Sequence, residues 1–217
     1  MKLSNRTIQI LKSFSTINPS IMFEEGNVLS TISSGKTILA KAKISETFEK
    51  QFGVFELSRF LGVLSMFNDP ELVLHDDYVK ITDGKKSVNF IYAFEESMVL
   101  PPKKDIKLTD PYVEFTLTND VLQNIMKGAS ILQLNTIAIE GTGHRMLCKA
   151  IDLSNPSNNS VEIDLQEESR KYRIVFSGNN LKLLPHDYKV KIAKGISHFV
   201  SDEVEYFIAT EASSTYE

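Results

Sequence analysis

A succession of short apolar runs separated by turn residues most constrains what this chain can fold into. The runs alternate apolar and polar side chains or are rich in β-branched residues. Such runs are typical of β-strands, whose successive side chains point to opposite faces of a sheet. They are Val28 to Ile32, Ile38 to Ile44, Leu72 to Leu74, Val88 to Phe94, Val113 to Leu117, Thr136 to Ile139, Met146 to Ile151, Val161 to Leu165, Tyr172 to Phe176, Tyr188 to Ile192 and Val204 to Ala209. The pattern predicts a protein dominated by β-sheet.

Four segments instead carry apolar residues at the spacing of an amphipathic helix. They are Ser4 to Phe14, Leu57 to Phe67, a segment that starts after Thr118 and ends near Gly128, and a weaker one from Asn179 to Leu184. Ser4 and Thr118 are preferred N-cap residues, and Pro185 must end the last segment. The sequence therefore predicts four helices among the strands.

Length and composition narrow the class of protein. The chain has 217 residues, of which 42% are hydrophobic and 24% charged, which is enough for one large or two small domains. No apolar run approaches the ~20 residues that cross a bilayer, and the N-terminus lacks the apolar core of a signal peptide. Cys148 is the only cysteine, so neither an intrachain disulfide nor a cysteine-based zinc cluster can form. We expect a cytoplasmic protein.

The stretch from Glu95 to Pro111 has little apolar periodicity and contains three prolines, which disfavour the interior of a paired strand. It is typical of an extended connector, and we predict two domains, residues 1–104 and 105–217. The starts of the two halves also match at an offset of 114 residues, where Leu3-Ser4-Asn5 corresponds to Leu117-Thr118-Asn119. A chance match between two capped helices is the alternative, but duplication explains the match better.

A set of short motifs follows a fixed order along nearly the whole chain. The first half contains Met1-Lys2-Leu3-Ser4, Leu11-Lys12-Ser13-Phe14 with Thr16-Ile17-Asn18, and Phe60-Leu61-Gly62-Val63-Leu64-Ser65 followed by Asn68-Asp69. The second half contains Leu132-Gln133-Leu134 with Thr136-Ile137-Ala138-Ile139, the pair Tyr188-Lys189, and the tail Ala209-Thr210-Glu211-Ala212-Ser213-Ser214-Thr215. Together they resemble the sliding clamps of T-even-type bacteriophages. Residues 71–116 and 153–170 depart from the family pattern.

The resemblance implies an α+β protein with the DNA-clamp fold, in which two similar domains each combine antiparallel sheet with two helices. Three subunits would close head to tail into a pseudo-sixfold ring around double-stranded DNA. The implied function is that of a processivity factor, which tethers the replicative DNA polymerase after an ATP-dependent clamp loader has placed the ring on DNA. The resemblance also raises a role in late transcription, and it implies the cytoplasm of an infected bacterial host as the location.

The polar faces of the predicted helices carry one or two cations each. The cations are Arg6, Lys12, Arg59, Lys127 and Lys182, against the acidic Glu56 and Asp120. Because the chain has a net charge of -4, a basic surface can only be local, but a local lining suffices when a closed ring holds DNA topologically. The resemblance implies that the five cations face the DNA backbone and give no sequence specificity. The alternative is that they are ordinary solvated surface charges.

A binding site for partner proteins is implied beneath the connector, where clamps hold polymerase and loader. The apolar residues Phe94, Val99 and Leu100 are therefore candidates for this pocket. Simple packing in the core or in the connector is the alternative for each of them.

Catalytic and metal sites have no convincing candidate, so we expect no enzyme activity, no cofactor and no metal. The stretch from Ser33 to Thr37 ends like a phosphate-binding P-loop, but Ser30 stands where the first glycine belongs and a strand follows. His144 and Cys148 lie on one face of a predicted strand but about 13 Å apart, too far for a nucleophile and its base. The competing interpretation is a β-rich phage structural or interaction protein that does not bind DNA, which would leave the cation-bearing helices unexplained.

Overall fold

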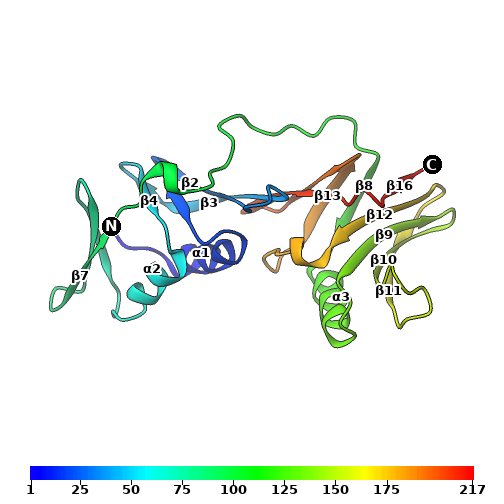
Figure 1. Ribbon diagram of the computed structural model, residues 1–217, viewed down its shortest axis with the longest axis horizontal. Helices are drawn as coiled ribbons and strands as arrows, with labels where there is room; N and C mark the ends of the chain where they lie inside the picture. The colour runs from blue at the N-terminus through cyan, green and yellow to red at the C-terminus, as the bar shows by residue number, and fades with distance from the viewer. The chain divides into compact units, whose positions relative to one another are not determined.

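Short antiparallel strands are the predominant secondary structure of the chain, and three α-helices interrupt them (Figure 1). The computed structural model describes residues 1–217. Their contacts divide the chain into two units: one contains residues 1–105 and 202–205, and the other contains residues 106–201 and 206–217. None of the helices is both long enough and apolar enough to span a lipid bilayer.

The first unit contains two sheets and two helices. Four of its strands pair in the order β4-β1-β2-β3, and three form a separate sheet in the order β5-β6-β7. The elements are α1 (Asn5–Ile17), β1 (Ile21–Phe23), β2 (Gly26–Ile32), β3 (Ile38–Phe48), β4 (Phe52–Val54), α2 (Leu57–Leu64), β5 (Glu71–Leu74), β6 (Tyr78–Thr82), β7 (Ser87–Ile91) and the 3-10 turn η1 (Glu95–Ser97).

The second unit repeats the combination of strands with a helix. Its strands pair in the orders β11-β10-β9-β12-β16 and β15-β14-β13-β8. The elements are β8 (Val113–Leu117), α3 (Asn119–Ile131), β9 (Thr136–Thr142), β10 (Arg145–Ile151), β11 (Val161–Glu167), β12 (Lys171–Ser177), the 3-10 turn η2 (Gly178–Asn180), β13 (Tyr188–Ala193), β14 (Ile196–Val200), β15 (Val204–Ala209) and β16 (Thr215–Tyr216). The first two residues of β15 are counted with the first unit.

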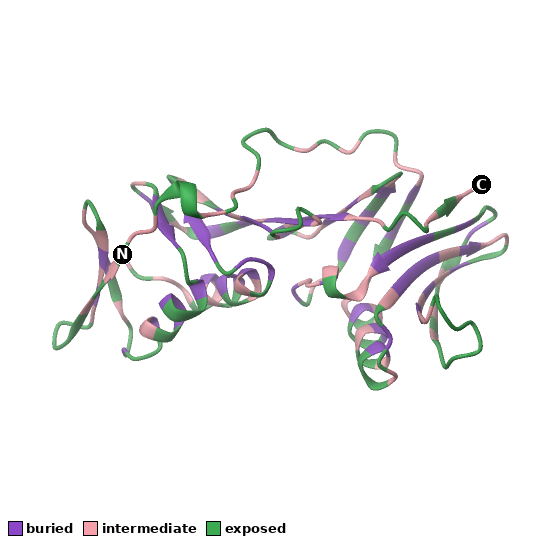
Figure 2. Cartoon of the chain, viewed as in Figure 1, coloured by how far each residue is buried: buried purple, intermediate pink, exposed green.

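Helix α1 forms where the sequence predicts it. The Ser4 side chain caps it by accepting a hydrogen bond of 3.1 Å from the Thr7 N–H. The residues Ile10, Leu11 and Phe14 are buried where the helix packs on β2, β3 and α2. Removing such side chains from water stabilises the helix by roughly 1.5–3 kcal/mol each. The burial of this stripe leaves the opposite face of the helix exposed (Figure 2).

Helix α3 begins as predicted but runs further than predicted. The Thr118 side chain accepts a hydrogen bond of 3.3 Å from the Val121 N–H, and the helix continues through Gly128 to Ile131. Gly128 is therefore not an end signal. A Cβ atom at this position would lie 2.8 Å from a methyl group of Val161 on β11, so the glycine allows the helix to approach the sheet closely.

The predicted fourth helix, Asn179 to Leu184, is wrong. Only the 3-10 turn η2 forms, and the chain from Leu181 to β13 is irregular. Asparagine, which occupies the first two positions of the segment, is a weak helix former, and a segment of six residues before a proline is too short to repay helix nucleation. The second half therefore has one α-helix instead of the two that the clamp resemblance implies.

Aromatic packing attaches α2 to the sheet of the first unit. Phe23 on β1 stacks on Phe52 on β4, with ring centroids 4.5 Å apart, and contacts Phe60 of α2 at 6.1 Å. Phe48 on β3 meets the edge of Phe23 at 4.9 Å. All four rings are buried, so they fix α2 with its polar face directed outward.

Candidate nucleic-acid interface

The exposed faces of the three helices are polar and almost free of carboxylates. On α1 the exposed stripe consists of Asn5, Gln9, Lys12 and Thr16. Of the 28 aspartates and glutamates in the chain, only Asp120 lies within an α-helix. The same helices carry the four cations Arg6, Lys12, Arg59 and Lys127. In a chain with a net charge of -4, this bias produces locally basic surfaces suited to contact with phosphate.

Two of the predicted DNA-facing cations extend freely from their helices. Lys12 on α1 and Lys127 on α3 are exposed and lie opposite the buried stripes. Arg59 on α2 is 69% exposed and forms an ion pair of 2.6 Å with Glu56, three residues earlier at the helix N-cap. Such an exposed pair is weak, so the guanidinium can exchange its partner at little cost.

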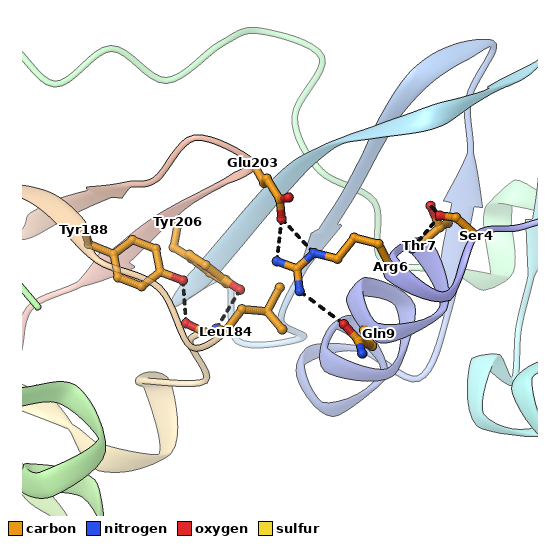
Figure 3. Close-up of polar contacts among 8 residues, drawn as sticks. All are labelled: Ser4, Arg6, Thr7, Gln9, Leu184, Tyr188, Glu203 and Tyr206. Atoms are coloured by element: carbon orange, nitrogen blue, oxygen red, sulfur yellow. Dashed lines mark hydrogen bonds and ion pairs between the residues drawn. The ribbon is translucent and has the colours of Figure 1, made fainter. Parts of the chain in front are cut away.

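Arg6 is held more firmly than the other cations. Its Nε donates to an Oε2 oxygen of Glu203 at 2.7 Å, an Nη atom pairs with the same oxygen, and the other Nη donates to Gln9 at 3.2 Å (Figure 3). Glu203 lies on the turn between β14 and β15, and its carbonyl accepts a hydrogen bond of 3.0 Å from the Lys43 N–H on β3. The turn is thereby fixed beside α1.

Lys182 does not lie on a helix. It is half-buried on the irregular segment between η2 and β13. Two tyrosine hydroxyl groups hold this segment: that of Tyr206 accepts from the Leu184 N–H at 3.1 Å, and that of Tyr188 donates to the Leu184 carbonyl at 2.7 Å (Figure 3). Both rings are fully buried. The segment therefore has a fixed position although its backbone lacks helical hydrogen bonds.

A carboxylate occupies the N-terminus of α1. Glu46 on β3 accepts hydrogen bonds from the Ser4 N–H and, at 2.6 Å, from the Thr7 hydroxyl. Burial of this carboxylate opposes its ionisation, but hydrogen bonds from Thr7, Ser4 and Ser45 outweigh burial and lower the pKa of Glu46 to about 2. Helix N-termini bind anions, and here the protein supplies the anion itself. A phosphate group would therefore meet the side of α1 and not its end.

The connector is attached to the first unit at several points. The buried Asn18 side chain donates to the carbonyls of Ile32 at 2.7 Å and Val99 at 3.1 Å. Lys41 on β3 forms an ion pair with Asp105. Between these two attachments the chain passes over the sheet and leaves a groove of about 560 Å³. The groove is lined by Met22, Glu24, Glu25, Val28, Ser30, Lys41, Gln51, Glu95, Leu100, Pro101, Pro102 and Lys103.

Of the three apolar residues predicted for a partner pocket, one lines this groove and two do not. Leu100 lines it. Val99 is partly exposed, and Phe94, which precedes η1, is 81% exposed. Packing in the core therefore does not account for Phe94. The sequence analysis missed the groove wall on β2, where the exposed Val28 lies, because only the fold brings β2 under the connector.

The far end of the connector is held by a buried carboxylate. Glu168 pairs with Arg170 at 2.8 Å and accepts a hydrogen bond of 3.1 Å from the Tyr172 hydroxyl. The Arg170 hydrogen bonds outweigh the effect of burial and lower the pKa of Glu168 to about 2. Arg170 also donates to the carbonyl of Tyr112 and lies over its ring, 5.0 Å from the centroid. This contact fixes the residue that precedes β8.

The sites that the sequence analysis rejected are structural. Ser33 to Thr37 form the turn between β2 and β3, where the Ser33 hydroxyl accepts from the N–H groups of Thr37 and Ile38 at 3.0 and 3.1 Å. Cys148 is buried, and burial raises the pKa of its thiol to about 12, so it is no nucleophile at neutral pH. No group of three or more His, Cys, Asp or Glu side chains is arranged to hold a metal ion.

Comparison with known proteins gives matches along the whole chain. A family model described as DNA polymerase processivity factor matches residues 2–99, and one described as gp45 sliding clamp, C terminal, matches residues 114–212. The sliding clamp of Vibrio phage KVP40 is 32% identical over 98% of this chain and 100% of its own length. The chain belongs to the sliding clamps. The clamps of Escherichia phage RB69 and Enterobacteria phage T4 are 30% and 28% identical, with both chains covered completely.

Solved clamps share the fold at much lower sequence identity. The PCNA of A. fulgidus superposes with a TM-score of 0.74 at 11% identity, over 98% of this chain and 97% of its own. The DNA polymerase III beta chain of Streptococcus pneumoniae TIGR4 gives a TM-score of 0.70 at 15% identity, over 97% of this chain and 64% of its own. The clamp fold implied by the sequence motifs is therefore confirmed. As a sliding clamp, the protein is a polymerase processivity factor and not an enzyme, and the interpretation as a structural protein that does not bind DNA is wrong.

The low pKa of Glu46 predicts how its contribution to clamp stability depends on pH. The pKa in the folded state, about 2, lies below the ordinary value of 4.5. This contribution is therefore fully present above pH 4.5 and is lost as the pH falls toward 2. Glu46→Gln should lower the free energy of unfolding at pH 7 by about 0.5–1 kcal/mol and flatten its acid dependence. Urea unfolding at pH 7, 5 and 3 measures both effects.

The matched control for this experiment is Glu49→Gln, because Glu49 is exposed just beyond the same strand. It should follow the wild type at every pH. Glu168 and Asp152 also have pKa values of about 2, so a residual acid dependence persists in both variants. Equal curves for Glu46→Gln and Glu49→Gln would contradict the role of Glu46 at the helix end.

Proposed function

We propose that three copies of this clamp close head to tail around duplex DNA, with the exposed faces of α1, α2 and α3 toward the phosphates. The observation that carries the proposal is the charge bias of the helices, which contain four cations and a single carboxylate in an acidic chain. An ATP-dependent clamp loader opens the ring, and the closed ring then tethers the replicative polymerase in the host cytoplasm. The same loaded ring would serve a second role in late transcription.

The acidic net charge is compatible with this function because the hold on DNA is topological. A protein that binds DNA by affinity alone needs many phosphate contacts, and its binding weakens steeply with salt. A closed ring needs only enough positive charge to favour threading and to keep the duplex off its wall. Contacts to phosphate carry no sequence information, so the clamp can move along any sequence.

The five cations serve this lining to different degrees in the proposal. Lys12 and Lys127 face phosphate directly because they are exposed on helix faces. Arg59 joins them by exchanging Glu56 for phosphate, and Lys182 contributes from its fixed irregular segment. Arg6 is restrained by Glu203. We assign residues 1–104 and 105–217 to the two clamp domains, each of which contributes cations to the lining.

We further propose that the groove beneath the connector receives a peptide segment of the polymerase or of the loader. Its apolar lining is formed by Met22, Val28, Leu100, Pro101 and Pro102. The exposed Phe94 and Val99 directly precede its lining residues Glu95 and Leu100 in the sequence. The other seven lining residues are polar or charged, so the groove combines an apolar strip with polar groups that can fix the orientation of a bound segment. The PCNA of A. fulgidus was solved with the C-terminal region of FEN-1 bound, which supports peptide docking as a mode that this fold allows.

Reversing the lining charges should impair loading and processivity without unfolding the clamp. In the variant Lys12→Glu, Lys127→Glu, Lys182→Glu, each change alters the local charge by two units in every subunit, within a Debye length of ~8 Å of phosphate. Primer extension with cognate polymerase, loader and ATP should fall on the order of tenfold. Exposed substitutions usually cost within about 0.5 kcal/mol, so thermal unfolding and the ring mass from light scattering should change little. Because Lys182 is half-buried, its single variant is measured beside the triple variant.

The control for this experiment reverses three exposed lysines outside the helices, Lys85, Lys107 and Lys194. It applies the same change in net charge and should retain processivity. Equal losses in the two triple variants would show that net charge matters and that the helix faces do not line the DNA path. Loss of the ring in the first variant would place these lysines at a subunit interface instead.

Introducing a charge into the connector groove should weaken partner binding while the ring still loads. Val28→Glu places a carboxylate on the groove wall at an exposed position, so folding should be preserved. Burying that charge against an apolar peptide should reduce polymerase affinity by roughly tenfold or more. Fluorescence anisotropy of labelled polymerase measures the effect. The matched control is Val73→Glu on β5, which is similarly exposed but does not line the groove. If both variants bind polymerase like the wild type, the groove is not the docking site.

A further inference from the structure

The ion pair between Arg6 and Glu203 places an anion beside a helix face that is otherwise basic. The Arg6 side chain is 35% exposed and that of Glu203 is 44% exposed, so both remain within reach of a ligand outside the protein. Three nitrogen atoms of the guanidinium are engaged by Glu203 and Gln9 (Figure 3). Arg6 therefore differs from Lys12, which extends from the same helix to solvent.

A backbone hydrogen bond fixes the position of Glu203, so its pairing with Arg6 does not depend on the two side chains alone. Its own carbonyl accepts a hydrogen bond from the Lys43 N–H, which ties the turn to β3. Two further acidic residues, Asp202 and Glu205, lie within two positions of Glu203 in the sequence. A guanidinium held by a fixed carboxylate is a charge-assisted pair, about twice as strong as a neutral hydrogen bond. The fold thus maintains a carboxylate on Arg6.

We propose that Glu203 is a positioning residue that withholds Arg6 from DNA phosphate and so keeps the grip of the loaded clamp weak enough for sliding. The inference rests on the proposed function, in which the α1 face lies toward DNA. Carboxylate and phosphate both match the planar fork of arginine, so they compete for the same donors. While the Glu203 carboxylate pairs with the Arg6 guanidinium, the two charges cancel, and Arg6 adds no net positive charge to the helix face. When Glu203 is removed, Arg6 becomes a phosphate contact in every subunit.

The test compares Glu203→Ala with Asp202→Ala, which removes the same charge from the same turn. The readout is the one-dimensional diffusion coefficient of the labelled, loaded clamp on stretched DNA at low and high salt. In Glu203→Ala the coefficient should fall by roughly two-fold or more at low salt, and the difference should shrink at high salt because phosphate contacts are screened. Asp202→Ala should change it much less. Thermal unfolding and ring mass check that neither variant disturbs the fold.

The double variant Arg6→Gln, Glu203→Ala shows whether Glu203 acts through Arg6. In the Arg6→Gln background, removal of Glu203 should leave diffusion unchanged. Equal slowing by Glu203→Ala with and without Arg6, or equal slowing by Asp202→Ala, would overturn the inference in favour of a general charge effect. If Glu203→Ala has no effect while the reversal of Lys12, Lys127 and Lys182 still impairs processivity, this inference fails and the proposed function stands. If neither set of variants has an effect, the proposed orientation of the helices fails as well.

Discussion

The burial of one stripe of each helix against strands is the constraint on which the rest of this structure depends. Leu11 and Phe14 on α1, Phe60 on α2 and Ile125 on α3 are buried. Their burial fixes the orientation of each helix about its axis and so directs the opposite face outward. Their polar side chains must project outward, and the sequence has placed lysine and arginine there while nearly excluding carboxylates. A protein with a net charge of -4 thereby acquires locally basic surfaces on its helices. The same helical spacing of apolar and polar residues therefore determines both how the helices pack and where their positive charges lie.

The carboxylates that approach the helices act at the ends and edges and not on the exposed faces. Glu46 closes the N-terminus of α1, Glu56 lies beside Arg59, and Glu203 holds Arg6. Glu46 and Glu203 each occupy a group that would otherwise bind an anion, whereas the weak pair with Glu56 leaves Arg59 able to change partner. Lys12 and Lys127 remain exposed on the helix faces. In the proposed orientation, a surface of this kind would attract duplex DNA without binding it at fixed points, because a flexible ammonium group is easily exchanged between phosphates. Such weak attraction suits a processivity factor that must remain on DNA and still move along it.

Local pattern predicted the elements that depend on local physics. The caps Ser4 and Thr118, the apolar stripes and most of the strands are readable because each involves residues a few positions apart. The alternating strand β14 was not predicted. The fourth helix does not form because the segment before Pro185 is too short to repay helix nucleation. Tyrosine hydroxyls from β13 and β15 hold the backbone of Leu184 instead, and residues 179–184 do not reveal those partners. Glu46, Glu203 and the groove wall at Val28 were missed for the same reason. Their partners lie far away in sequence, and opposite charges alone do not show which residues meet.

We propose above all that the hold of this protein on DNA is topological and not a matter of affinity. The most direct measurement loads the labelled clamp onto nicked circular DNA, removes the loader and free clamp, and follows retention before and after a restriction enzyme linearises the circle. A topological hold predicts long retention on the circle even at raised salt and rapid loss through the new ends after cutting. Blocking those ends should prevent the loss. Equal retention on circular and linear DNA, with a steep loss as salt rises, would show ordinary phosphate binding and contradict the claim.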